Sequence, residues 1–96
     1  MIPSITATGF ALEQEQQELI EKKLKRIKYA EEWLVDLTLR IKLDKKFIFE
    51  CTLNFRWGAS THIESDDYDF AAGLNKLLDI LDQKVKKEKD KMQERN

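Results

Sequence analysis

Two clusters of basic side chains are the residues of this sequence that could bind a ligand directly. The first cluster lies at 22–28 and the second at 84–91. Lysine and arginine can act as positive charges against the phosphates of an RNA backbone. The candidates for phosphate contact are Lys22, Lys23, Lys25, Arg26, Lys84, Lys86, Lys87, Lys89 and Lys91. Helix dipoles also favour cations at helix C-termini. The placement of the basic residues is therefore also compatible with an ordinary solvated helix end that binds no RNA.

Cys51 and His62 are the side chains that nucleophilic catalysis or a metal site would need. They lie on opposite parities of two predicted strands, so we expect them on opposite faces of the sheet. A buried, unreactive thiol is therefore the better interpretation of Cys51. A metal site would need more Cys or His ligands than this chain contains, since it has 1 of each. We predict a protein that is not an enzyme and that uses no cofactor and no metal.

Acidic residues cluster just after His62, at Glu64, Asp66, Asp67 and Asp69. Such a cluster could bind a divalent cation. Its position at the start of a predicted helix instead favours capping and interaction with the helix dipole. We expect Ser65, Asp66 or Asp67 to cap that helix.

The two long predicted strands carry further candidates on their two faces. Basic residues of the polar parity could extend a positive surface; they are Arg40, Lys42, Arg56 and His62. A solvated face, on which they pair with Asp36, Glu50 and Glu64, is the favoured interpretation. Aromatic residues of the other parity could stack on RNA bases; they are Trp33, Trp57, Phe47, Phe49 and Phe55. They share their parity with leucines, which favours core packing instead.

These residues belong to a predicted α+β fold with the order β-α-β-β-β-α in two layers. Apolar and polar residues alternate strictly from Trp33 to Leu43 and from Phe47 to Trp57, which predicts two half-buried strands. Shorter strands are expected at Pro3–Phe10 and Ser60–Glu64, and a helix at Glu13–Tyr29. The last helix has an apolar stripe of Phe70, Leu74, Leu77, Leu78, Leu81 and Val85. We expect Leu53 and Leu81 to be almost fully buried.

The composition indicates one domain over residues 1–96, with a C-terminal tail that frays from about residue 88. The net charge is −1 although 36% of the residues are charged, so any positive surface must be local. No run approaches the roughly 18–20 apolar residues needed to cross a bilayer, and the N-terminus has no signal-peptide pattern. With a single cysteine, a reducing cytoplasmic compartment is the simplest expectation.

Five blocks of this sequence, in order, resemble the ribosome hibernation-promoting factors, also called ribosome-associated inhibitors or protein Y, in their short form. The blocks are Ile5-Thr6, the segment 21–27, the segment from Gly58 through 62–65, the segment 69–77 and the segment 84–91. The sequence departs from the family pattern at Ala7 and Thr8, where the family usually has a basic pair. It also has Ala71 at the position of a family tyrosine, and Gln16 at an apolar position.

The resemblance implies two helices side by side on one face of a four-stranded sheet. It also implies a function: binding the small ribosomal subunit where messenger RNA and transfer RNAs would bind. Translation would then be inhibited by occupancy, under stress or slow growth, with the basic helix ends on ribosomal RNA phosphates. We expect a monomer that binds no membrane and no small-molecule substrate.

Two other functions are compatible with the same residues. If the two helices lie parallel, we expect both basic helix ends to meet on one edge of the domain. A general double-stranded RNA-binding domain could use this basic edge. A protein-interaction module could use the polar sheet face, or the tail as a helix that docks in a partner's groove. Salt dependence separates these classes, because phosphate contacts weaken steeply with salt and apolar contacts do not.

Overall fold

The computed structural model describes residues 3–94, and the side chains of residues 3–92. The elements along the chain are β1 (Ser4–Thr8), α1 (Gln14–Leu24), the 3-10 helix η1 (Lys25–Trp33), β2 (Leu34–Asp44), β3 (Lys46–Phe55), β4 (Ser60–Asp67) and α2 (Phe70–Glu94). This is the predicted α+β order. Residues 1, 2, 95 and 96 of the expected domain lie outside the described residues, and the expected fraying of the tail stays a prediction.

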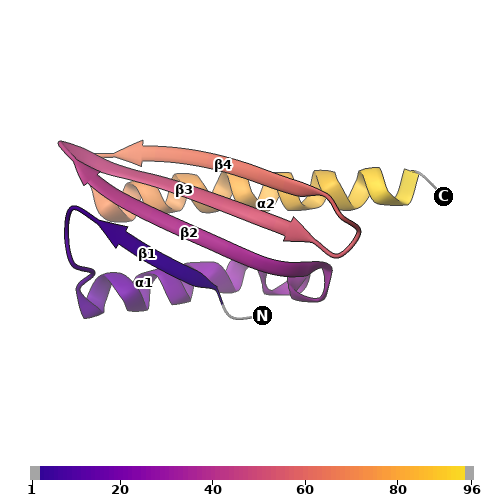
Figure 1. Cartoon of the computed structure of the whole chain (residues 1–96), viewed down its shortest axis with the longest axis horizontal. Helices are drawn as coiled ribbons and strands as arrows, with labels where there is room; N and C mark the ends of the chain where they lie inside the picture. The colour runs from indigo at the N-terminus through magenta and orange to yellow at the C-terminus, as the bar shows by residue number, and fades with distance from the viewer. Residues whose placement is uncertain (1–2, 95–96) are drawn as a thin grey trace.

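A mixed four-stranded sheet in the order β1-β2-β3-β4 forms one layer of the molecule. β1 pairs with β2 in parallel, and the other two pairs are antiparallel. Both helices lie on the same face of this sheet and run in the same direction, α1 with η1 behind β1 and β2, and α2 behind β3 and β4 (Figure 1). The predicted placement of both helices on one face is therefore confirmed.

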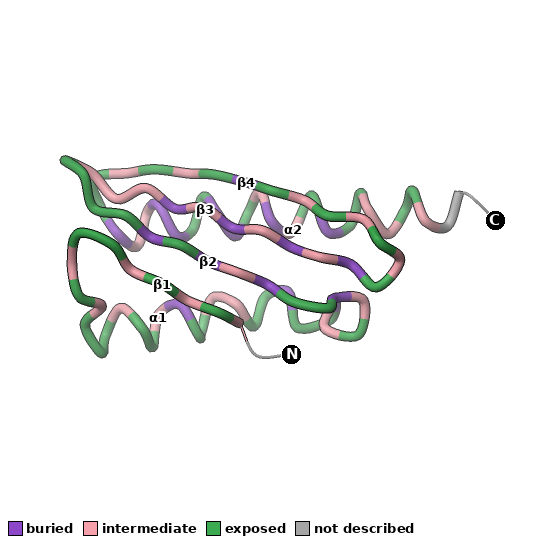
Figure 2. The backbone as a smooth tube through the Cα atoms, viewed as in Figure 1, coloured by how far each residue is buried: buried purple, intermediate pink, exposed green. Residues whose placement is uncertain are grey.

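Period-two alternation places the core residues of β2 and β3 against the helices. The inward residues Leu37, Leu39 and Ile41 on β2 and Cys51 and Leu53 on β3 are all buried. Buried segments alternate with more exposed ones along both strands (Figure 2). The predicted alternation is wrong at the start of β2. The pairing with β3 shifts by one residue between Leu34 and Asp36, so Leu34 turns inward and Val35 is left 58% exposed. The cause is a β-bulge, in which one residue has no partner across the ladder.

The helical stripe of α2 supplies the other half of the core. Its six predicted core residues, from Phe70 to Val85, are all buried, and Leu53 and Leu81 have 0% exposure as expected. Gly73 lets α2 approach the sheet closely, because a Cβ atom there would lie 2.4 Å from Cε1 of Phe49. Since Phe49 is fully buried, its ring has little room to move aside.

The first helical segment differs from the single helix expected up to Tyr29. α1 begins with a capping box between Glu13 and Gln16 and ends at Leu24, where the chain continues as the 3-10 helix η1. In η1, Ile27 and Ala30 are buried and Trp33 is half-buried. η1 is kinked at Ile27, whose φ of −109° and ψ of 16° are not helical, so it consists of two short helical pieces.

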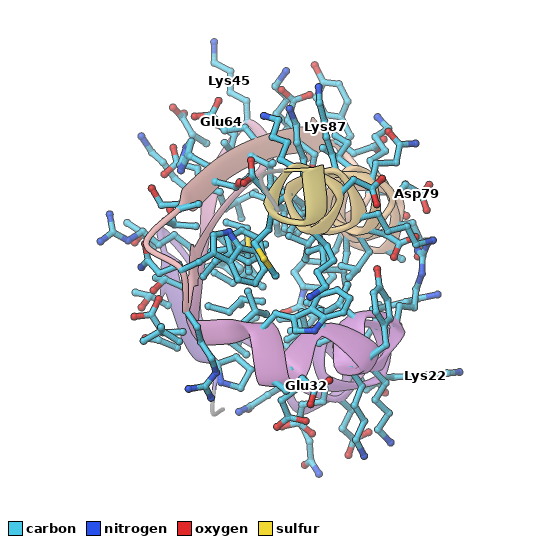
Figure 3. The ribbon with its side chains drawn as sticks, turned by 90° about the vertical axis from the view of Figure 1, so that its right-hand side faces the viewer. Lys22, Glu32, Lys45, Glu64, Asp79 and Lys87 are labelled. Carbon is cyan, nitrogen blue, oxygen red and sulfur yellow. The ribbon has the colours of Figure 1, made fainter. Side chains whose placement is uncertain are left out.

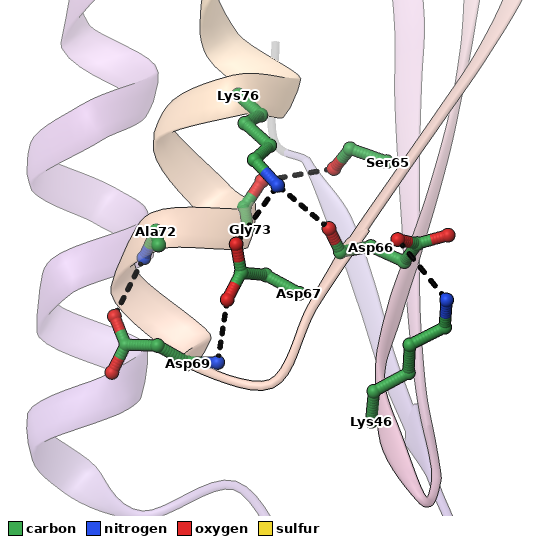
Figure 4. Close-up of polar contacts among 8 residues, drawn as sticks. All are labelled: Lys46, Ser65, Asp66, Asp67, Asp69, Ala72, Gly73 and Lys76. Atoms are coloured by element: carbon green, nitrogen blue, oxygen red, sulfur yellow. Dashed lines mark hydrogen bonds and ion pairs between the residues drawn. The ribbon is translucent and has the colours of Figure 1, made fainter.

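The N-terminus of α2 is capped by Asp69, so the expected caps Ser65, Asp66 and Asp67 are wrong. The Asp69 carboxylate accepts a hydrogen bond from the backbone N–H of Ala72 at 2.9 Å (Figure 4). The three expected residues belong to β4, which pairs with β3 up to Asp67 and so delays the helix. Ser65 donates its hydroxyl to the carbonyl of Gly73, and Asp66 pairs with Lys46.

Asp67 supports the same turn without capping the helix. Its carboxylate accepts the backbone N–H of Asp69 at 2.8 Å and pairs with Lys76 of α2 at 2.8 Å. The hydrogen bond from Lys76 lowers the pKa of Asp67, and the same bond raises the pKa of Lys76. Lys76 also donates to the Asp66 carbonyl, so one lysine ties the helix to the end of β4.

Replacing Asp69 by Ala is expected to lower the free energy of unfolding by about 1 kcal/mol, because the N–H of Ala72 loses its acceptor. Asp66→Ala is the control, since it removes only an exposed ion pair with Lys46 and should cost less than about 0.5 kcal/mol. Urea unfolding of both variants measures the difference. Equal costs at the two positions would show that the cap had been assigned to the wrong residue.

Candidate nucleic-acid interface

The two helical segments meet along a seam of polar side chains. Arg26 pairs with Asp79 at 2.9 Å, and the Tyr29 hydroxyl donates a short hydrogen bond to Asp82. Both contacts join residues 53 positions apart, so the two segments run parallel and in register. Their C-terminal ends therefore point in the same direction as expected, but the last turn of η1 carries no basic residue.

Acidic residues of α2 neutralise part of the positive charge in this seam. Asp82 accepts the Tyr29 hydroxyl and also pairs with Lys86 at 3.1 Å. The hydrogen bond from Tyr29 lowers the pKa of Asp82. Partial burial, with the same hydrogen bond, raises the pKa of Tyr29. Arg26 and Lys86, two of the predicted phosphate ligands, thus already have carboxylate partners within the protein.

A second group of cations lies on the outer side of α2. Lys84, Lys87 and Lys91 are spaced by three and four residues and are all exposed, so they form a stripe that we call the outer lysine row. Lys91 pairs weakly with Glu88 at 3.6 Å. Lys84 and Lys87 have no carboxylate partner among residues 3–92. The outer lysine row therefore keeps most of its positive charge available.

The basic residues of α1 and η1 do not join that row. Lys22 is exposed and projects from the lower helix in Figure 3, whereas Lys87 projects from α2 on the far side of the helical layer. Lys23 is half-buried, and Lys25 borders a small hollow beside Leu24 and Leu37. The structure thus brings Arg26 and Lys86 together at the seam but places Lys22 and Lys87 on different sides of the molecule.

Lys89 is the predicted site residue with the least ordinary surroundings. Its ammonium lies over the rings of Trp33 and Trp57, at the end of the molecule where η1, the β3–β4 turn and α2 meet. Both tryptophans are half-buried, while Phe49 and Phe55 are fully inside the core. Strand alternation predicts core positions for both tryptophans but does not predict this contact, because the contact depends on where α2 passes over the sheet.

The catalytic alternatives are separated in space. Cys51 is buried, and burial raises its pKa to about 12. His62 lies on the open face, with Nδ1 3.0 Å from the Thr52 hydroxyl and Nε2 3.2 Å from Glu64. The prediction that Cys51 and His62 face opposite sides of the sheet is confirmed. Within residues 3–94, no group of three or more His, Cys, Asp or Glu side chains is arranged to hold a metal ion.

The expected pairing of the basic strand residues with acidic neighbours is only partly present. His62 pairs with Glu64 as expected, and Arg40 and Lys42 are exposed on the open face. Arg56 follows β3 and donates its Nε to the carbonyl of Glu32 at 2.6 Å, so it links the β3–β4 turn to η1. In the described part of the chain, no helix has the length and apolar character needed to span a membrane.

Comparison with known proteins assigns this arrangement to a family. The profile described as sigma 54 modulation protein / S30EA ribosomal protein matches residues 4–93. No curated protein sequence matches the chain significantly. The fold is similar to that of a ribosomal subunit interface protein from Coxiella burnetii, with a TM-score of 0.85 and 22% identity over 94% of this chain and 99% of the other. It is also similar to the N-terminal domain of Thermus thermophilus Protein Y, with a TM-score of 0.76 and 22% identity over 91% and 98% of the two chains.

Proposed function

This chain belongs to the sigma 54 modulation protein / S30EA ribosomal protein family, and we propose that it binds the small ribosomal subunit and inhibits translation. It would occupy the region where messenger RNA and transfer RNAs bind, as the sequence resemblance implies. It acts by binding, as a cytoplasmic monomer, and catalyses no reaction. No cofactor or metal takes part.

The outer lysine row is the observation that carries this proposal. Three exposed lysines follow one another along a single stripe of a helix inside the family match, at 84, 87 and 91. One helical turn rises by about 5.4 Å, so the three charges are spaced closely enough to follow successive phosphates of one RNA strand. The helix dipole alone would favour basic residues in the last turn, but Lys84 lies well before that turn.

Lys22, Lys23 and Lys25 of α1 and η1 form a second contact region in this proposal. Lys22 lies on another side of the helical layer from Lys87 (Figure 3), so this region would meet a different RNA segment from the one that the outer lysine row meets. A folded ribosomal RNA surface can surround a small domain in this way, whereas a single straight duplex cannot. The division of the cations therefore favours a ribosomal site over general double-stranded RNA binding.

Co-sedimentation of the purified protein with small ribosomal subunits across a salt series tests the proposal. If about six lysines contact phosphates, the affinity should fall by roughly three orders of magnitude between about 50 and 200 mM salt. A mixed-sequence RNA duplex of similar mass is the control ligand and should bind more weakly at every salt concentration. Absence of binding to small subunits, or binding that is insensitive to salt, would overturn the proposal.

A further inference from the structure

Lys86 and Lys89 both lie over aromatic rings near the end of α2, but Lys86 lies over Tyr29 and also pairs with Asp82, whereas Lys89 lies over two indoles. Its Nζ lies 4.9 Å from the centre of the Trp33 ring and 5.7 Å from that of Trp57. Both distances are within the range of about 6 Å over which an aromatic face attracts a cation. The Lys89 side chain is half-buried, and among the described side chains no carboxylate pairs with it. We call Trp33, Trp57 and Lys89 the indole clamp.

The two indoles of the clamp are held in place without the help of Lys89. The backbone N–H of Arg56 donates to the carbonyl of Trp33 at 2.9 Å, which joins the segments that carry the two tryptophans. Trp57 stacks on Phe55, with ring centres 5.0 Å apart and planes at 21°. The Tyr29 ring meets Trp33 edge-on at 5.9 Å. The clamp therefore offers α2 a pre-organised docking point.

The last turns of α2 need such a docking point. Val85 is the last fully buried residue on the described part of α2, and Glu88 and Met92 beyond it are only half-buried. The helix nevertheless continues to Glu94 and carries Lys87 and Lys91. Two helical turns without a buried apolar face are only marginally stable by themselves in water. Lys89 lies in the middle of this segment, where one contact can hold both turns.

We infer that Lys89 is a positioning residue, which docks the end of α2 on the two indoles and thereby orients the outer lysine row for RNA. This inference rests on the proposed function. A phosphate that engaged Lys89 would have to draw its ammonium away from two aromatic faces, whereas Lys87 and Lys91 are exposed and available. Lys89 thus contributes to RNA binding through the helix it holds, and it makes no phosphate contact of its own.

The test compares Lys89→Met with Lys87→Met, since each variant loses one positive charge from the same helical turn. Lys89→Arg keeps a cation on the indoles and should behave like the unchanged protein. The 2 tryptophans of the chain are both in the clamp, so intrinsic fluorescence reports on the clamp alone. Hydrogen exchange of residues 86–92 reports whether the end of α2 is held. The salt dependence of small-subunit binding counts the phosphate contacts.

For Lys89→Met we expect altered tryptophan emission and about fivefold faster exchange of residues 86–92. Small-subunit affinity should fall about fivefold with an unchanged salt slope, because the loosened helix is ordered again on binding. For Lys87→Met we expect unchanged emission and a log–log slope that is shallower by about 0.7–0.9.

Two results would overturn the inference. One is a slope for Lys89→Met that is as shallow as that of Lys87→Met, since Lys89 would then contact a phosphate itself. The other is unchanged emission together with unchanged exchange, since the clamp would then hold nothing. If the unchanged protein fails to bind small subunits, the proposed function fails. The emission and exchange measurements would still decide whether Lys89 holds the end of α2.

Discussion

Changing Lys84 and Lys87 together to glutamate is expected to weaken small-subunit binding by about a hundredfold at physiological salt. Each reversal removes a phosphate contact and adds repulsion, and the loss of two contacts should make the log–log salt slope shallower by about 1.4–1.8. Inhibition of translation in a cell-free assay should be lost at protein concentrations where the unchanged protein inhibits fully. Co-sedimentation across a salt series measures the affinity and the slope.

The matched control for this double variant is Lys42→Glu with Lys45→Glu. These two lysines are also exposed, but they lie on β2 and in the β2–β3 turn, so the same change in net charge occurs away from the outer lysine row. Both double variants should unfold within about 0.5 kcal/mol of the unchanged protein, since none of the four side chains is buried. Equal inhibition by the Lys84/Lys87 variant and the unchanged protein would exclude the outer lysine row as the contact.

Leu81→Ala is expected to lower the free energy of unfolding by about 2–5 kcal/mol, because it leaves a cavity between α2 and the sheet. Leu81 has 0% exposure and lies in the middle of the apolar stripe. For a domain of 96 residues this cost is a large share of the total stability. The midpoint of urea unfolding should fall while the slope of the transition stays the same.

Ile80→Ala on the same helix is the comparison for Leu81→Ala. Ile80 is only half-buried, at the margin of the core, so its truncation should cost clearly less than that of Leu81. Equal losses of stability in the two variants would contradict the assignment of Leu81 to the core face of α2 and of Ile80 to its margin.

Local patterns in the sequence were sufficient to predict most of the architecture. The alternation from Leu37 to Ile41 and from Phe49 to Phe55 depends only on which side of a strand each residue occupies, and every inward position in it is buried. The stripe of α2 has a helical period for the same reason, and its residues are buried as predicted. The opposed placement of Cys51 and His62 also follows from parity alone. These features could be predicted because each depends only on the local order of apolar and polar residues.

The availability of each cation for RNA is a tertiary property. Helical periodicity places Lys89 on the line of Leu81 and Val85, whereas Lys87 lies off that line, but it does not predict which side chains cover Lys89. Arg26 is paired because Asp79, 53 positions away, faces it across the seam. Lys89 is covered because η1 and the β3–β4 turn place two indoles beneath it. Lys84 and Lys87 are exposed on α2 and have no carboxylate partner among the described side chains.

Four further features of the structure depend on how separate segments pair and pack. The bulge at Val35 arises from the register of β2 on β3, and the cap at Asp69 arises because β4 pairs as far as Asp67. η1 is kinked at Ile27, and both Ile27 and Ala30 are buried in the core. Glycine is required at position 73 because the Phe49 ring lies against it and leaves no room for a side chain. The sequence by itself determined most of the elements, their order and most of their inward faces, because these follow from local periodicity. Only the packing of distant segments decided which charges are paired and which remain available to bind RNA.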